Sequence, residues 1–157
     1  MPKIKYCSLY LFMARIKLNP PHQILFSIEL KVRVSDINYG GHLGNDRLLA
    51  LLQEARIGFF NALGFKGEKA ITEEVGIIMS DAAIMYKSEA FLGEELKIGI
   101  DVEEIFSKGC DLKYQVDELK SGRLVAIAKT GIVFFNYSER KIANVPDIFL
   151  QRINHQT

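Results

Sequence analysis

One long helical segment stands among segments that alternate like strands, and this contrast limits the folds open to the chain. Between Asn45 and Leu63, apolar residues recur at steps of three and four, which predicts an amphipathic helix of about five turns. Gly64 follows and is expected to end the helix as a C-terminal glycine cap. The stripe expected to be buried consists of Leu48, Leu52, Ala55, Phe59 and Leu63.

The remaining segments predict strands and turns. Residues 23–34 end in an alternation of apolar and charged side chains that is typical of a half-buried strand. A short helix is expected within residues 68–76, and Pro146 is expected to open a last helical turn. Further strands are expected at residues 77–89, 95–105, 110–119, 123–135 and 142–145, with turns at 92–93, 107–109 and 121–122.

The predicted order is one strand, one long helix, and then four or five antiparallel strands in a meander. Such a sheet buries one face, and the chain offers a single long apolar helix to cover it. We therefore expect an α+β fold, in which a curved antiparallel sheet of five or six strands wraps around one long central α-helix. Residues 23–157 are expected to form this single domain, with residues 1–22 as an N-terminal extension.

The first 22 residues differ from the rest, because basic residues bracket an apolar run and no acidic residue occurs before Glu29. A signal peptide or an amphipathic targeting segment is one interpretation. The apolar run is shorter than the roughly 20 residues that cross a bilayer, so no membrane span is predicted. We prefer an extension upstream of a start at Met13, joined to the domain by the residues LNPP.

Composition argues against several classes of function. Of the 157 residues, 48% are apolar and 25% are charged, and the formal net charge is +1. This balance lacks the excess of one sign that is typical of proteins binding nucleic acid or anionic membranes. Cys7 and Cys110 stand far apart without metal-ligand spacing, so a reducing, cytoplasmic location is expected. His22, His42 and His155 are also scattered, so no metal site is predicted.

The polar loop SDINYGGHLGN, residues 35–45, leads from the first strand directly into the helix. The first N–H groups of a helix lack intrahelical partners and carry partial positive charge, so they can hold an oxyanion or a polarised carbonyl. Glycines let a ligand approach this backbone closely, which makes Gly41, Gly44 and Asn45 candidate substrate-binding residues. The alternative is that Asn45 only caps the helix, the glycines only shape the turn and Asp36 only organises the loop.

A second line of residues runs along the helix nearly opposite the buried stripe. Ala50, Glu54 and Gly58 are spaced four apart and therefore share a face. A carboxylate between two small residues leaves room for a ligand or a second subunit to approach the helix. The alternative is that Glu54 is a solvated surface acid.

Together these segments resemble the hotdog-fold thioesterases of the 4-hydroxybenzoyl-CoA and acyl-carrier-protein (ACP) types, from Ile24 to Val145. The resemblance rests on Asp36, Asn38, Gly41, His42, Asn45, the residues Glu54-Ala55-Arg56 and the sequence LGEELKI from Leu92 to Ile98. It implies hydrolysis of an acyl-CoA or acyl-ACP thioester, with no cofactor beyond the CoA or phosphopantetheine of the substrate. It also implies a homodimer or homotetramer, in which loop residues of one chain face helix residues of the other.

The site differs from the family pattern at several positions. Family members that use a loop carboxylate carry a second Asp where this chain has Asn38, and an amide can act neither as a base nor as a useful nucleophile. The pattern instead resembles acyl-ACP thioesterases, in which Asn, His and a helix acid are implicated. Their usual HVNN reads HLGN here, and the spacing from Asp36 to His42 is two residues longer.

Thioester hydrolysis needs an oxyanion site and a water molecule directed at the carbonyl carbon. Backbone N–H groups near His42 to Asn45 are candidates for the first task. Glu54, Asp36 and His42 could hold or deprotonate water, with Asn38 orienting it by hydrogen bonds. We predict Glu54 as the main base or water-holder, because we expect its carboxylate to be partly buried.

Two other functions are compatible with the same residues. An (R)-specific enoyl-CoA hydratase has a D-x-N-P-x-H motif, so Asp36, Asn38 and His42 would be catalytic and Glu54 dispensable. The proline is absent here, and the spacing from Asp to His is one residue longer. A non-catalytic acyl-CoA-binding module is the second alternative, favoured by the missing second Asp.

Overall fold

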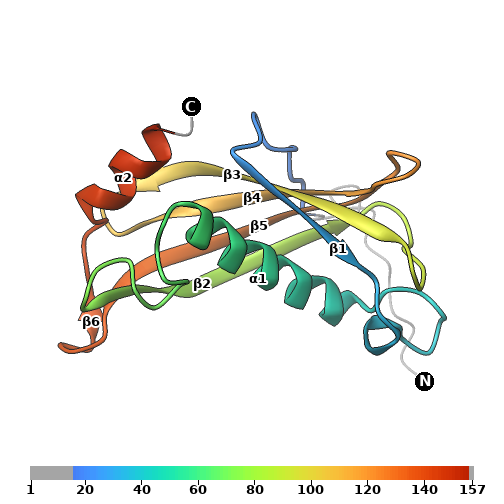
Figure 1. Cartoon of the computed structure of the whole chain (residues 1–157), viewed down its shortest axis with the longest axis horizontal. Coiled ribbons are helices and arrows are strands. Elements are labelled where there is room, and N and C mark those ends of the chain that lie inside the picture. The colour runs from blue at the N-terminus through green and yellow to red at the C-terminus, as the bar shows by residue number, and fades with distance from the viewer. Residues whose placement is uncertain (1–15, 156–157) are drawn as a thin grey trace, which may run out of the picture.

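The computed structural model describes residues 16–155, and Figure 1 shows an antiparallel sheet curved around one long helix. This is the expected α+β hotdog architecture, with six strands in the sheet. The elements are β1 (Phe26–Lys31), a 3-10 turn (Val34–Asp36), α1 (Asn45–Ala62), β2 (Val75–Tyr86), β3 (Glu95–Phe106), β4 (Gly109–Glu118), β5 (Leu124–Asn136), β6 (Lys141–Ile142) and α2 (Asp147–Asn154).

Helix α1 lies in the concave face of the sheet and forms the centre of the core, as Figure 1 shows. All five residues of the predicted stripe are buried. Burial of a large apolar side chain contributes about 1.5–3 kcal/mol, so this stripe is a major part of what holds helix and sheet together. Gly64 has a φ of +82°, which confirms the expected glycine at the C-terminal end of the helix.

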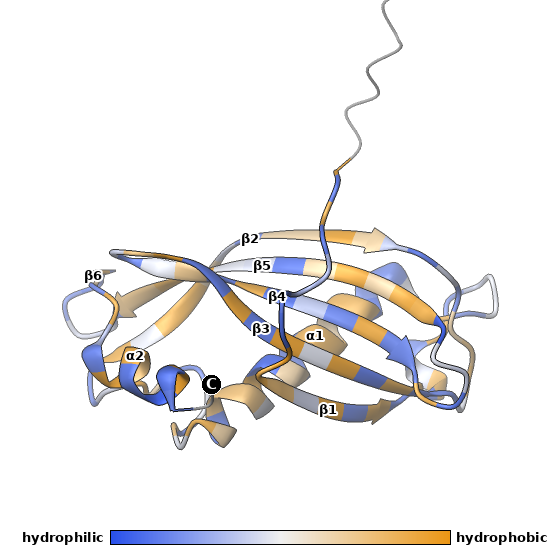
Figure 2. Ribbon diagram, turned by 90° about the horizontal axis from the view of Figure 1, so that it is seen from above, coloured by the Kyte–Doolittle hydropathy of each residue, from blue (hydrophilic) through white to orange (hydrophobic). Residues whose placement is uncertain are grey.

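The strand order is β1-β3-β4-β5-β2, with β6 paired to β5, and every pairing is antiparallel. Leu96, Ile98 and Ile100 alternate along β3 and are all buried, and Figure 2 shows the alternation of hydropathy along the strands. The expected meander is found from β3 to β6 but not for β2, which pairs with β5 instead of β3. Alternation indicates which face a side chain occupies, but it does not identify the neighbouring strand.

Three smaller expectations were also wrong. Residues 68–74 form turns and bends instead of the short helix expected within residues 68–76, and β2 begins at Val75. Val34 lies in the 3-10 turn and is 77% exposed, because the chain leaves the sheet after Lys31. Helix α2 has eight residues where a single turn was expected.

The chain before β1 lies against the sheet. Gln23 N donates to Asp101 Oδ2 at 3.2 Å and Leu18 N to Met85 Sδ at 2.8 Å, so this segment reaches from β3 to β2. The expected boundary at residue 22 stays a prediction, and Cys7 lies outside the described residues. Among residues 16–155, no helix is long and apolar enough to cross a membrane.

Candidate active site

The loop between β1 and α1 is organised around Asn38. The Asn38 N–H donates to His42 O at 2.9 Å, and the Asn38 carbonyl accepts from Gly41 N at 3.1 Å. The side-chain oxygen of Asn38 accepts from Gly40 N at 2.8 Å. Gly41 has a φ of +79°, a conformation that favours glycine. The loop is therefore a tight turn that brings the Asn38 and His42 side chains together.

Asp36 anchors the start of this loop. Its carboxylate accepts from Arg33 N at 2.8 Å and Arg33 Nε at 3.2 Å, and its carbonyl accepts from Gly44 N at 2.8 Å. Burial raises the pKa of Asp36, but the hydrogen bonds and charge of Arg33 outweigh it, so the net pKa lies below its usual value. The structure thus places Asp36 in the loop's framework, outside the cavity that the loop borders.

That cavity has a volume of about 500 Å³ and lies between the loop, the start of α1 and the connection from β2 to β3. Four of the seven predicted site residues line it: Asn38, His42, Gly44 and Asn45. Its deeper wall is apolar and buried, formed by Leu43, Leu48, Ala90 and Val125. The cavity therefore combines a small apolar chamber with polar groups nearer its mouth.

Two polar side chains face one another across this cavity. His42 Nδ1 lies 3.1 Å from the Leu43 carbonyl, so this nitrogen carries the proton when it makes that hydrogen bond. His42 Nε2 lies 3.8 Å from Glu89 Oε1. A β-carbon added at Gly40 would come within 2.9 Å of His42 Nε2 and 3.1 Å of Asn38 Oδ1, so both groups border the space beside this glycine.

Glu89 is the site residue that the sequence analysis missed. It lies at the end of the segment predicted as a strand and follows β2 in the structure. A carboxylate in a connection beyond a strand is one weak signal for such a residue. Nothing local indicates that it faces His42, because that contact depends on how β2 and the site loop meet in three dimensions.

The start of α1 forms another wall of the cavity. The N-cap residue is Gly44, so Asn45 does not cap the helix as the alternative interpretation expected. Asn45 is instead the first residue of α1. The Asn45 carbonyl accepts from Tyr86 Oη at 3.0 Å, which joins the helix start to the end of β2. The backbone N–H groups of a first helical turn carry partial positive charge, so this wall can stabilise an anionic oxygen.

Glu54 lies apart from the cavity within one chain. Its side chain is 49% exposed, and Arg33 Nη2 is 3.9 Å from its Oε2. Within the single chain the Glu54 carboxylate is therefore half exposed and lies beside Arg33 instead of lining the cavity, and its catalytic role stays a prediction. The space expected beside Gly58 is filled, because a β-carbon there would lie 3.2 Å from Phe26 Cζ of β1. Ala50 is exposed.

Metal-ligand chemistry finds no support in this part of the chain. Among residues 16–155, no group of three or more His, Cys, Asp or Glu side chains is arranged to hold a metal ion. The groups that line the cavity include an imidazole, a carboxylate, amides, hydroxyls, one ammonium group and the start of a helix. These groups can polarise a carbonyl and direct water at it.

One protein-family model matches most of this chain. The model of the thioesterase-like superfamily matches residues 32–153, which include the site loop, α1 and the whole sheet from β2 onward. The chain belongs to the thioesterase-like superfamily. A search of curated proteins gives no match.

Solved structures with a similar fold include two CoA thioesterases and a protein in complex with CoA. A 1,4-dihydroxy-2-naphthoyl-CoA thioesterase from Synechocystis has a TM-score of 0.74 at 21% identity, covering 82% of this chain and 95% of that chain. A gentisyl-coenzyme A thioesterase has a TM-score of 0.72 at 19% identity, covering 82% and 99%. A Staphylococcus aureus protein in complex with CoA has a TM-score of 0.76 at 15% identity, covering 89% and 87%. At these identities the likeness shows the fold alone.

Proposed function

We propose that this protein is a thioesterase that hydrolyses an acyl-CoA thioester in the cavity between the site loop and α1. The observation that carries the proposal is the convergence of His42, Asn38 and Glu89 beside a helix start, within a superfamily of thioesterases. The buried apolar wall suits an acyl or aroyl group, and the polar groups near the mouth suit the thioester. No cofactor is needed beyond the CoA of the substrate.

Each group has a role in the proposed reaction. The N–H groups at the start of α1 stabilise the carbonyl oxygen as it becomes an oxyanion. A water molecule held between His42 and Glu89 attacks the carbonyl carbon, and this pair takes its proton. When the C–S bond breaks, that proton goes to the leaving thiolate, so the products are a free acid and CoA. Asn38 orients the imidazole and the water.

Glu89 thus takes the role that the sequence analysis predicted for Glu54. Within one chain, Glu89 is the carboxylate beside His42, whereas Glu54 points toward Arg33 and solvent. Glu54 could act only where a partner subunit brings it to the cavity. CoA is preferred over a carrier protein as the thiol carrier, because a structural relative was determined in complex with CoA. Lys87 at the cavity's lining offers a positive charge to the phosphates of CoA.

We further propose that the protein is a homodimer, or a homotetramer built from dimers. Strand β2 is a terminal strand of the sheet formed by the described residues, and Ile78 and Met79 on it are 37% and 46% exposed. Exposed apolar edge strands invite pairing, and two β2 edges related by a two-fold axis would close both. Light scattering at micromolar concentration tests this; a monomer, or a Met79→Lys variant with unchanged mass, would contradict it.

The enzymatic proposal is tested by thiol release from short, long and aromatic acyl-CoAs, read with Ellman's reagent. Wild type is expected to turn over at least one class. Glu89→Gln should lower kcat by about 10²–10⁴-fold, as expected for loss of a general base. Glu73→Gln is the matched control, since it makes the same change on an exposed carboxylate that does not line the cavity. Full activity in Glu89→Gln would remove Glu89 from the mechanism.

The two alternatives give different outcomes in the same experiment. A hydratase would consume the double bond of an enoyl-CoA without releasing thiol. The structure disfavours that activity, because both Arg33 donors occupy the Asp36 carboxylate that a hydratase would need. A binding module would bind an acyl-CoA tightly and leave it intact.

A further inference from the structure

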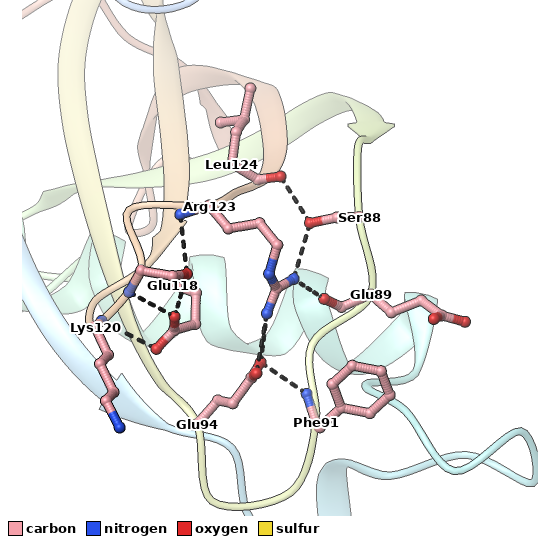
Figure 3. A network of polar contacts seen from close by, with 9 residues as sticks. Ser88, Glu89, Phe91, Glu94, Glu118, Lys120, Arg123 and Leu124 are labelled. Carbon is pink, nitrogen blue, oxygen red and sulfur yellow. Dashed lines mark hydrogen bonds and ion pairs between the residues drawn. The ribbon is translucent and has the colours of Figure 1, made fainter.

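Arg123 lies immediately before β5, beside the connection from β2 to β3, residues 87–94. Its Nη2 donates to both carboxylate oxygens of Glu94, at 2.9 Å each. Its Nη1 donates to Ser88 Oγ at 2.9 Å and to the carbonyl of Glu89, and Ser88 Oγ donates onward to the Leu124 carbonyl at 2.8 Å. One guanidinium therefore serves four acceptors of the same connection, as Figure 3 shows.

This connection is also tied to the loop that carries His42. Leu43 N donates to the Ala90 carbonyl at 2.8 Å. Leu43 follows His42 in the chain and Ala90 follows Glu89, so this hydrogen bond lies next to both site residues. On the other side, the Glu94 carboxylate accepts from Phe91 N at 3.0 Å, which closes the connection on itself. Hydrogen bonds thus hold the backbone on both sides of Glu89. Arg123 connects the two sides, because it bonds to Ser88 and Glu89 near one end of the connection and to Glu94 at the other.

We propose that Arg123 is a positioning residue for the His42–Glu89 pair. The Glu89 side chain is 64% exposed, and an exposed side chain keeps much of its rotamer freedom. The position of its backbone therefore decides how often the carboxylate meets the imidazole. Arg123 fixes that backbone by donating to the Glu89 carbonyl. This inference rests on the proposed function, because it assigns Arg123 a task in the same site.

The chemistry of the contact requires an arginine. The planar guanidinium presents donors in a fixed fork, so it can bind a carboxylate with one nitrogen and two further oxygens with the other. A lysine at this position offers a single nitrogen and cannot span Glu94 and Glu89 together. The Arg123 and Glu94 side chains are one third and one quarter exposed, so Arg123→Met also removes a largely buried ion pair. Urea unfolding of the variant therefore separates a loss of stability from a loss of placement.

A double-mutant cycle on the full-length protein tests the proposal. Arg123→Met is expected to lower kcat by on the order of tenfold to a hundredfold, since small misplacements of a reacting group have effects of that size. KM should change by less than about threefold, and Arg123→Lys should recover only part of kcat. In a Glu89→Gln background, Arg123→Met should lower kcat by less than about a further twofold, because the carboxylate that Arg123 positions is already lost. If the fold-changes in kcat of the two single variants multiplied in the double variant, the residues would act independently and the proposal would be overturned.

A second measurement does not depend on turnover. The ring resonances of His42, identified by their loss in His42→Asn, are compared by NMR at one fixed pH in wild type, Glu89→Gln and Arg123→Met. Arg123→Met should reproduce most of the change in chemical shift that Glu89→Gln makes. Arg152→Met is the matched control, because Arg152 donates to the Leu63 carbonyl near α2 and should leave the His42 shifts unchanged. Wild-type His42 shifts in Arg123→Met would refute the positioning role even if no acyl-CoA were hydrolysed.

Discussion

Replacing Gly40 by alanine should damage the site while sparing the fold. The added β-carbon would lie 2.9 Å from His42 Nε2 and 3.1 Å from Asn38 Oδ1, closer than the roughly 3.5–4.0 Å of an unstrained contact. The His42 ring is the end of a rotatable side chain, so it can move by about 0.5–1 Å instead of forcing the backbone apart. The alanine therefore shifts the imidazole away from its place opposite Glu89.

The magnitudes differ for activity and for stability. A misplacement of about 1 Å at a reacting group can cost on the order of a hundredfold in rate, so kcat/KM should fall by tenfold to a hundredfold. Gly40 does not have a positive φ, so alanine is compatible with its backbone, and the free energy of unfolding should change by less than about 1 kcal/mol.

Gly41, the next residue, gives the opposite comparison. A β-carbon there meets nothing within 4 Å, but the residue's φ is +79°, so Gly41→Ala should cost about 1–2 kcal/mol of stability through backbone strain. Urea unfolding and acyl-CoA kinetics on both variants separate the two effects. Wild-type kcat/KM in Gly40→Ala, or a larger loss of stability there than in Gly41→Ala, would refute the reasoning.

Three further predictions concern the fold. Arg56 is buried and its Nε lies 2.5 Å from Glu68 Oε1, so Arg56→Met should lower the free energy of unfolding in urea by roughly 3 kcal/mol, because a mostly buried carboxylate loses its partner. The lowered pKa of Asp36 means that its contribution to stability is present above the ordinary pKa and lost as pH falls through the folded value; Asp36→Asn should reduce the acid dependence of the thermal midpoint. Burial raises the pKa of Cys110 to about 12, so a Cys7→Ser variant should react with Ellman's reagent only after unfolding.

The sequence predicted the parts of this structure that depend on neighbours along the chain. The length of α1 follows from the period between Asn45 and Ala62 and from Gly64, and the inward face of β3 follows from its alternation. The site loop is local too, so Asn38 and His42 were singled out together. Their pairing with the connection after β2 could not be predicted, because strand partners depend on the whole sheet.

The three carboxylates near the site differ in their hydrogen-bond and ion-pair partners. Asp36 is engaged by Arg33, and Glu54 lies beside the same guanidinium at 3.9 Å while facing solvent. Glu89 faces the imidazole. No local pattern distinguishes these acids in the sequence, because each has the same side-chain chemistry and differs only in its neighbours. The base proposed from this geometry is Glu89, in the connection after β2, whereas the sequence predicted Glu54 on α1.

Asn38 offers a way to test whether a carboxylate beside His42 is what the reaction requires. Its side-chain oxygen accepts from Gly40 N at 2.8 Å, a bond that an aspartate of the same shape keeps, and it borders the same space beside Gly40 as His42 Nε2. Asn38→Asp in a Glu89→Gln background should therefore restore part of kcat, about tenfold or more, since it returns a base to the imidazole from the loop side. In the wild-type background the same change should not raise kcat, because two like charges would then compete for one ring. No recovery in the double variant would mean that Glu89 acts through its position on the far wall, and not simply as a carboxylate near His42.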